Sequence, residues 1–110
     1  MLIYDVKLEA LRLRRAIEKI SVDVWVNASG LSRHTVSSGL VERRLVLLIA
    51  KVSDARRLEA FRTVRQAGLV YRETSDVLHG RLKGARFQDT QLNEWRSDCL
   101  RLEVLWESLK

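Results

Sequence analysis

The sequence predicts an all-α fold: an antiparallel bundle of about four helices, formed by a single domain over residues 1–110. Three observations predict it. Apolar residues recur at spacings of three and four along four successive stretches, which places them on one face of a helix. The chain has no proline and only five glycines, a composition typical of long helices with short connections. Hydrophobic residues make up 46% and charged residues 31% of the chain, the balance of a globular protein with one modest core.

The first two helices are expected over residues 5–27 and after Gly30. The stripe of the first helix consists of Val6, Ala10, Leu13, Ile17, Ile20 and Val24. The second helix is expected to begin at an N-cap, Ser32, and its stripe consists of Val41, Leu45, Leu48 and Val52, widened by Leu40, Leu47 and Ile49. Residues 21–26 alternate like a half-buried strand, but they lack a partner strand, so we assign them to the first helix.

The third and fourth helices follow the breaks at residues 53–54 and 80–88. Ser53 or Asp54 can cap the third helix, and Gly80 is a natural C-terminal stop. The face of the third helix consists of Ala60, Val64, Ala67, Tyr71, Thr74 and Leu78. The fourth helix is expected to start at Asp89 or Thr90, and its stripe consists of Leu92, Trp95, Cys99, Leu102, Trp106 and Leu109.

The composition also excludes several classes of protein. No apolar run approaches the roughly 20 residues of a membrane span, and the N-terminus lacks the basic and apolar regions of a secretory signal. We therefore expect a cytoplasmic protein without a membrane partner. Two histidines and one cysteine have no zinc-ligand spacing, so we expect no metal and no cofactor. Cys99 lies on the apolar stripe of the last helix and is expected to be buried and inert.

The charge of the chain favours a polyanionic partner. Lysine and arginine total 20 against 14 acidic residues, a net charge of +6, and most of the cations are arginine. Arginine makes planar, bidentate contacts with phosphate, although it also suits surface ion pairs. Nucleic acid is therefore the favoured partner, RNA before DNA.

Arg72 and His79 form the most informative constellation. Seven residues are nearly two turns of a helix, so both side chains project from one face, about 10 Å apart in rise. Histidine can activate a ribose 2′-hydroxyl, and arginine can stabilise the charge that builds on phosphate. Ser75 and Asp76 lie between them and can orient the imidazole or bind the substrate. The structural alternative is that His79 only caps a helix C-terminus.

This segment resembles the HEPN family, all-α domains of about this size with an arginine, four to six residues and a histidine near a helix end. Six residues separate Arg72 from His79, and a glycine and a cationic loop follow. The pattern Gly-x-x-Arg-x-x-Val-Ser from Gly30 resembles the entry to the family's second helix, so the resemblance covers residues 30–109. After the arginine, active members often have Asn, Asp or His, where this chain has Glu73.

The resemblance implies a metal-independent ribonuclease of a toxin or defence system. Such enzymes build their site across a homodimer, which here would pair two copies of Arg72 and His79. Arg81, Lys83 and Arg86 would then draw in the phosphate backbone. An inhibitory or partner protein is a further expected class of partner.

Residues 26–40 resemble a helix-turn-helix instead. Gly30 would make the turn, Ser32 would cap the recognition helix, and Val36 would pack inward. The side chains facing the major groove would be Arg33, His34, Thr35, Ser37 and Ser38, with Arg43 and Arg44 on phosphates. This hypothesis predicts a DNA-binding regulator, and its structural alternative is a plain interhelical turn. A third hypothesis is a non-catalytic basic adaptor that binds protein or RNA.

Overall fold

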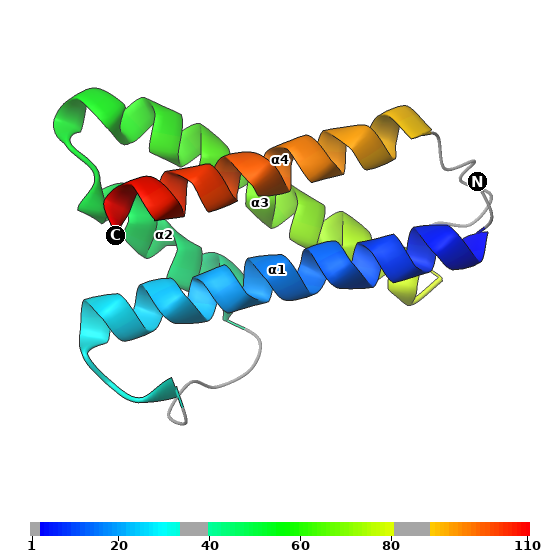
Figure 1. Ribbon diagram of the computed structural model, residues 1–110, viewed down its shortest axis with the longest axis horizontal. Coiled ribbons are helices and arrows are strands. Elements are labelled where there is room, and N and C mark those ends of the chain that lie inside the picture. The colour runs from blue at the N-terminus through cyan, green and yellow to red at the C-terminus, as the bar shows by residue number, and fades with distance from the viewer. Residues whose placement is uncertain (1–2, 34–39, 81–88) are drawn as a thin grey trace.

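The computed structural model describes residues 3–33, 40–80 and 89–110, and the helices there form an all-α bundle (Figure 1). The four α-helices are α1 (Ile3–Ser29), α2 (Val41–Lys51), α3 (Arg57–Leu78) and α4 (Asp89–Leu109). A single 3₁₀ turn, η2 (Asp54–Arg56), precedes α3. The predicted fold class is therefore confirmed.

The predicted apolar stripes form the core. All six stripe residues of α1 are buried, as are the four of α2, and they pack in one cluster with those of α3 and α4. Tyr71, Leu78 and Leu109 lie partly buried at its border, and Cys99 is inside it. Each helix therefore contributes the face that its periodicity predicts. The strand-like residues 21–26 lie within α1, as assigned.

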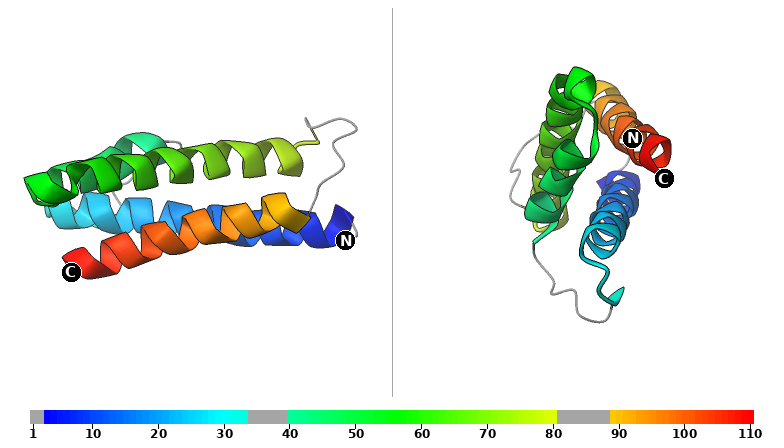
Figure 2. Two further views of the ribbon diagram at one scale, coloured as in Figure 1. Left: turned by 90° about the horizontal axis from the view of Figure 1, so that it is seen from above. Right: turned by 90° about the vertical axis from the view of Figure 1, so that its left-hand side faces the viewer.

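Helix α3 runs antiparallel to the other three helices (Figures 1 and 2). Arg56, at the start of α3, donates a hydrogen bond to Ser108 near the end of α4. Near the other end of α3, Glu73 accepts a hydrogen bond from Trp95, in the first half of α4. Helices α1 and α3 contact each other and both remaining helices, so α2 and α4 lie on opposite sides of the α1–α3 pair (Figure 2).

Helices α1 and α2 run in the same direction, although successive helices with short connections were expected to be antiparallel. Arg44, early in α2, donates a hydrogen bond to Ser21. Lys51, at the end of α2, bonds to Asn27 near the end of α1. The expected direction is wrong for this pair, because the start of α2 lies beside Ser21 and its end lies beside Asn27.

The predicted stops and starts are confirmed in part. Gly80 has a φ of 66° and its N–H donates to the carbonyl of Val77, so it ends α3 in the left-handed conformation that glycine favours. Gly30 has a φ of 71° and ends α1 in the same way. Ser32 is not the N-cap of the second helix, because α2 begins only at Val41, where its buried stripe also begins.

Candidate functional site

Arg72 is an exposed residue of α3 and forms an ion pair with Glu42 of α2. Its Nε lies 2.8 Å from Oε1 of Glu42, and 63% of the Arg72 side chain and 48% of the Glu42 side chain are exposed. Exposed pairs of this kind are worth about 0–1 kcal/mol, since both charges remain well solvated. An anion that binds the Arg72 guanidinium in place of Glu42 therefore loses little free energy by breaking this ion pair.

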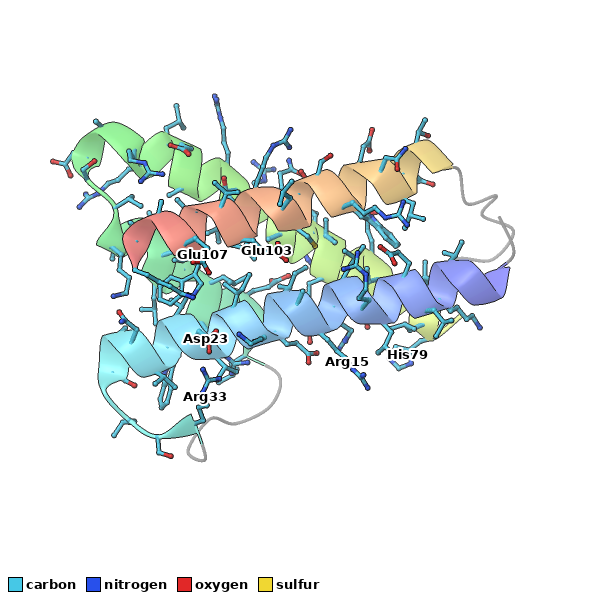
Figure 3. The ribbon with its side chains drawn as sticks, in the orientation of Figure 1. Arg15, Asp23, Arg33, His79, Glu103 and Glu107 are labelled. Carbon is cyan, nitrogen blue, oxygen red and sulfur yellow. The ribbon has the colours of Figure 1, made fainter. Side chains whose placement is uncertain are left out.

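His79 is the C-cap residue of α3 and is exposed (Figure 3). Its backbone N–H donates to the carbonyl of Ser75 at 3.0 Å. Within the part of the chain that the structure describes, its imidazole has no hydrogen-bond or ion-pair partner. The ring is therefore accessible to a bound substrate.

The residues between Arg72 and His79 face in different directions. Glu73 accepts a hydrogen bond from the indole Nε1 of Trp95 at 3.0 Å, which directs its carboxylate toward α4. Thr74 is buried and donates to the carbonyl of Tyr71. Glu73, the position where the chain departs from the HEPN pattern, therefore joins two helices and does not accompany Arg72 at the surface.

A groove between α2 and α3 surrounds the Arg72–Glu42 pair, and we call it the α2–α3 groove. The pair stands between two hollows that both of its residues line. One hollow, of about 360 Å³, is also lined by Leu40, Val41, Arg43 and Tyr71. The other, of about 180 Å³, is also lined by Val46, Ile49, Phe61, Val64, Arg65 and Gly68.

Two arginines of this groove have free guanidinium groups. Arg43 and Arg65 are exposed, and neither has an ion-pair or hydrogen-bond partner among residues 3–33, 40–80 and 89–110. Glu42, the acid nearest to them in the groove, is already paired with Arg72. The groove thus carries more positive charge than its own acids neutralise.

Gly68 faces Glu42 at this groove. A Cβ built at this buried position would lie 3.4 Å from Oε1 of Glu42, an ordinary van der Waals contact with the end of a flexible side chain. The glycine is therefore not required for the approach of α2 and α3, and it lowers the helix propensity of α3.

The remaining predicted nucleic-acid contacts are distributed unevenly. Arg81, Lys83 and Arg86 lie outside the described residues. Arg33 is bound to Asp23 of α1. Burial opposes ionisation of Asp23, yet its hydrogen bonds from Arg33 and Lys19 leave its pKa below the usual value.

Arg44 is a correction to the predicted contacts. Its side chain is buried, with 7% of the residue exposed, and its Nε donates to Oγ of Ser21 at 3.2 Å. A guanidinium held between two helices does not meet a phosphate on the surface. Arg44 therefore belongs to the α1–α2 interface and not to a binding site.

The described part of the helix-turn-helix segment leaves that hypothesis a prediction. Gly30, Leu31 and Ser32 are not helical, which is also what a turn followed by an N-cap requires, and Leu40 lies outside α2. A helix that continues without a break from Ser32 into α2 is absent from these residues. His34, Thr35, Val36, Ser37 and Ser38 lie outside the described residues.

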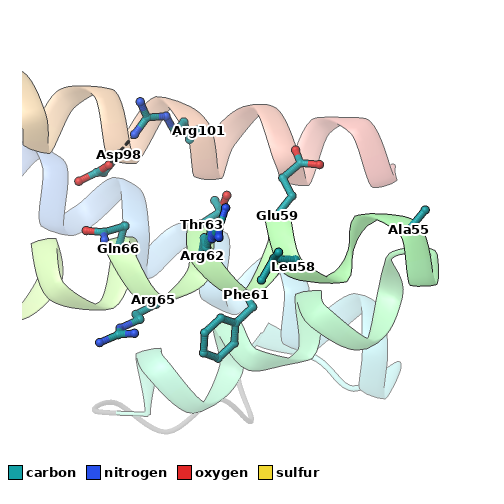
Figure 4. Close-up of a pocket in the computed structure, with 10 residues that line it drawn as sticks. All are labelled: Ala55, Leu58, Glu59, Phe61, Arg62, Thr63, Arg65, Gln66, Asp98 and Arg101. Atoms are coloured by element: carbon teal, nitrogen blue, oxygen red, sulfur yellow. Dashed lines mark hydrogen bonds and ion pairs between the residues drawn. The ribbon is translucent and has the colours of Figure 1, made fainter.

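A second, larger groove lies between α3 and α4, with a volume of about 850 Å³ (Figure 4). Leu58 and Phe61 line it and are 59% and 50% exposed. Its two acids are paired: Asp98 with Arg101 at 2.9 Å, and Glu59 with Arg56 at 3.4 Å. Arg62 and Arg65 also line it, and neither has an ion-pair or hydrogen-bond partner among the described residues. This α3–α4 groove contains neither Arg72 nor His79.

Sequence reasoning missed two residues of the α2–α3 groove, Glu42 and Arg65. The signal for Arg65 was present, because it stands seven residues before Arg72, as Arg72 stands seven before His79. No spacing or motif in the sequence near Glu42 indicated its role, because it pairs with Arg72 from another helix.

Neither a metal nor a reactive thiol is evident in the described residues. They contain no group of three or more His, Cys, Asp or Glu that could hold a metal ion. Burial raises the pKa of the Cys99 thiol to about 12, so the predicted burial is confirmed and the thiol stays protonated at neutral pH. Of the helices described, none combines the length and the apolar content that a membrane crossing needs.

Comparison with protein-family models, with curated proteins and with solved structures gives no match to this chain.

Proposed function

We propose that this protein is an HEPN-like domain that cleaves single-stranded RNA without a metal ion, in a toxin or defence system. One observation carries the proposal: Arg72 and His79 are both exposed on the C-terminal half of α3, beside a groove with uncompensated positive charge. A phosphate in the groove and a base for the 2′-hydroxyl are what this reaction needs.

In the proposed reaction, the neutral imidazole of His79 takes the proton of a ribose 2′-hydroxyl. The 2′-oxygen then attacks the adjacent phosphorus, and the bond from phosphorus to the 5′-oxygen breaks. The leaving 5′-oxygen receives a proton, which gives a 2′,3′-cyclic phosphate and a 5′-hydroxyl end. Arg72 leaves Glu42 and binds the phosphate oxygens as negative charge develops on them.

We further propose that two copies of the chain form the active unit, so that a second His79 can protonate the leaving oxygen. Exposed apolar side chains offer contact area for such a pair: Leu58, Leu100 and Val104 are each more than half exposed. Light scattering coupled to size-exclusion chromatography tests this proposal. A molar mass twice that of the 12.7 kDa chain supports it, and a monomer at all concentrations contradicts it.

The direct test is cleavage of single-stranded RNA in the presence of EDTA. The wild type should cleave, and His79→Ala should lower the rate by roughly 10²–10⁴-fold, the usual contribution of general acid–base catalysis. His34→Ala removes the other histidine of the chain and serves as the matched control, with an unchanged rate expected. Cleavage that needs a divalent metal, or that His79→Ala retains, would contradict the proposal.

A further inference from the structure

One face of α3 carries a row of exposed side chains that are evenly spaced along the helix. Arg65, Arg72 and His79 follow one another at intervals of seven residues, so each lies about 10 Å further along the same side of the helix. Phe61 stands one turn before Arg65, and both line the α2–α3 groove. Figure 4 shows Phe61 and Arg65 projecting together from α3 toward α2.

Two features of these side chains suit a ligand. The guanidinium of Arg65 has no partner in the described ranges of the chain, and half of Phe61 is exposed beside it. Several other exposed arginines are paired with neighbouring acids, as Arg101 is with Asp98 and Arg57 is with Asp54, and the unpaired Arg62 does not line this groove. A positive groove that contains an exposed aromatic ring is the arrangement that binds single-stranded nucleic acid, with phosphates on the cations and a base on the ring.

We infer that the α2–α3 groove holds a single strand of RNA along α3, with a base stacked on Phe61 and successive phosphates on Arg65 and Arg72. This inference rests on the proposed function, for which it supplies the substrate path. A duplex is excluded as the ligand of Phe61, since its paired bases offer no free face. Glu42 is the group that the strand displaces, because it occupies the Arg72 guanidinium in the absence of RNA.

The test measures binding separately from cleavage. The probe is a fluorescently labelled, 2′-O-methylated RNA of mixed sequence, which lacks the attacking hydroxyl. Its affinity is measured by fluorescence anisotropy over a series of salt concentrations for the wild type, Arg65→Gln, Phe61→Ala and Phe61→Trp. The matched control is Arg62→Gln, because Arg62 is also an exposed, unpaired arginine of α3 but lines only the α3–α4 groove.

Arg65→Gln should weaken binding about five- to tenfold and lower the slope of log affinity against log salt by about 0.7, the value for one phosphate contact on a single strand. Phe61→Ala should weaken binding about tenfold, and Phe61→Trp should restore it, as expected for stacking. Arg62→Gln should change the affinity about twofold or less. Circular dichroism confirms that each variant is folded.

Three results would overturn the inference: no binding of the probe, equal losses in Arg65→Gln and Arg62→Gln, or full affinity in Phe61→Ala. Displacement of the probe by an equally charged polyglutamate peptide as readily as by unlabelled RNA would also overturn it, because charge alone would then explain binding. If RNA cleavage requires His79 but is unchanged in Arg65→Gln, the proposed RNA path is contradicted and the proposed ribonuclease activity is supported. If binding depends on Arg65 but no cleavage occurs, the ribonuclease activity is contradicted and the RNA path is supported.

Discussion

The two grooves that border α3 differ in size and in the charged side chains that line them. The α3–α4 groove is the larger, with a volume of about 850 Å³, and contains the Asp98–Arg101 pair and the unpaired Arg62. The α2–α3 groove consists of hollows of about 360 and 180 Å³ and contains the unpaired Arg43 beside Arg72, the arginine that shares a helix face with His79. Arg65 lines both grooves. The groove with the larger volume is therefore not the groove that contains Arg72.

The largest expected effect is on the rate of RNA cleavage, which should differ between variants of the paired arginines in the two grooves. Arg72→Gln should lower RNA cleavage by about 10²-fold or more, because it removes the cation that stabilises the developing charge on phosphate. Arg101→Gln is the matched control: Arg101 is 67% exposed and paired at 2.9 Å, against 63% and 2.8 Å for Arg72. Initial cleavage rates in EDTA measure both, and equal losses in the two variants would remove the distinction between the grooves.

A smaller effect is expected from the acids of the same two pairs. Glu42→Gln should strengthen binding of the methylated RNA by about two- to tenfold, since the phosphate no longer competes with a carboxylate for Arg72. Asp98→Asn makes the equivalent change in the α3–α4 groove and should leave the affinity unchanged. Fluorescence anisotropy measures both affinities. Weaker binding in Glu42→Gln would mean that the ion pair holds Arg72 in place for the RNA.

An ion pair between Glu9 of α1 and Arg96 of α4 lies outside both grooves, and it is expected to affect stability. The hydrogen bond from Arg12 lowers the pKa of Glu9 from 4.5 to about 2; burial opposes this and Arg96 of α4 adds to it. A lowered pKa stabilises the fold fully above the unfolded value, and the stabilisation is lost as the pH falls from about 4.5 toward 2. Glu9→Gln should therefore cost about 1–2 kcal/mol at pH 7 and progressively less below pH 4.5.

Urea denaturation at several pH values measures this effect. Glu107→Gln is the control, because Glu107 is 67% exposed in its pair with Lys110, and it should change stability by about 0.5 kcal/mol or less. A loss in Glu9→Gln that does not depend on pH would contradict the assignment of the stabilisation to the carboxylate.

The smallest effect concerns the approach of the helices at the α2–α3 groove. Gly68→Ala should stabilise the protein by up to about 1 kcal/mol, because alanine favours the helix and the new Cβ meets only the flexible end of Glu42. Gly80→Ala should instead cost about 1 kcal/mol, since Gly80 has a φ of 66°. Urea denaturation measures both changes. A loss of stability in Gly68→Ala would show that the two helices cannot yield around an added methyl group.

Much of the fold could be predicted from the sequence because the buried stripes follow a strict helical spacing. The stripes of α1 and α4 are clear examples, and Gly80 marks a helix end by its chemistry. The start of α2 at Val41 could not be predicted, because the residue before it, Leu40, makes no side-chain cap, whereas Ser32 is a preferred N-cap type. The direction of α2 relative to α1 could not be predicted either, because the composition of residues 30–40 does not specify how the two helices are connected.

The candidate site could be predicted only where its residues share a helix. Arg72 and His79 were found by their spacing on α3, and the same spacing applied once more would have found Arg65. The pairing of Arg72 with Glu42 depends on how two helices pack, which spacing within one helix does not reveal. Arg44 could have been recognised as buried, since it lies three residues after Val41 and four before Leu48, on the stripe of α2.

The most direct test of the account is the chemistry of the RNA ends that the wild type leaves in EDTA. The account predicts 2′,3′-cyclic phosphate and 5′-hydroxyl ends, no cleavage where the attacking ribose carries a 2′-deoxy substitution, and formation of these ends by His79→Ala that is slower by the factor given above. Ends that carry a 5′-phosphate, or cleavage at a 2′-deoxy position, would contradict it, because the 2′-hydroxyl would then not be the nucleophile.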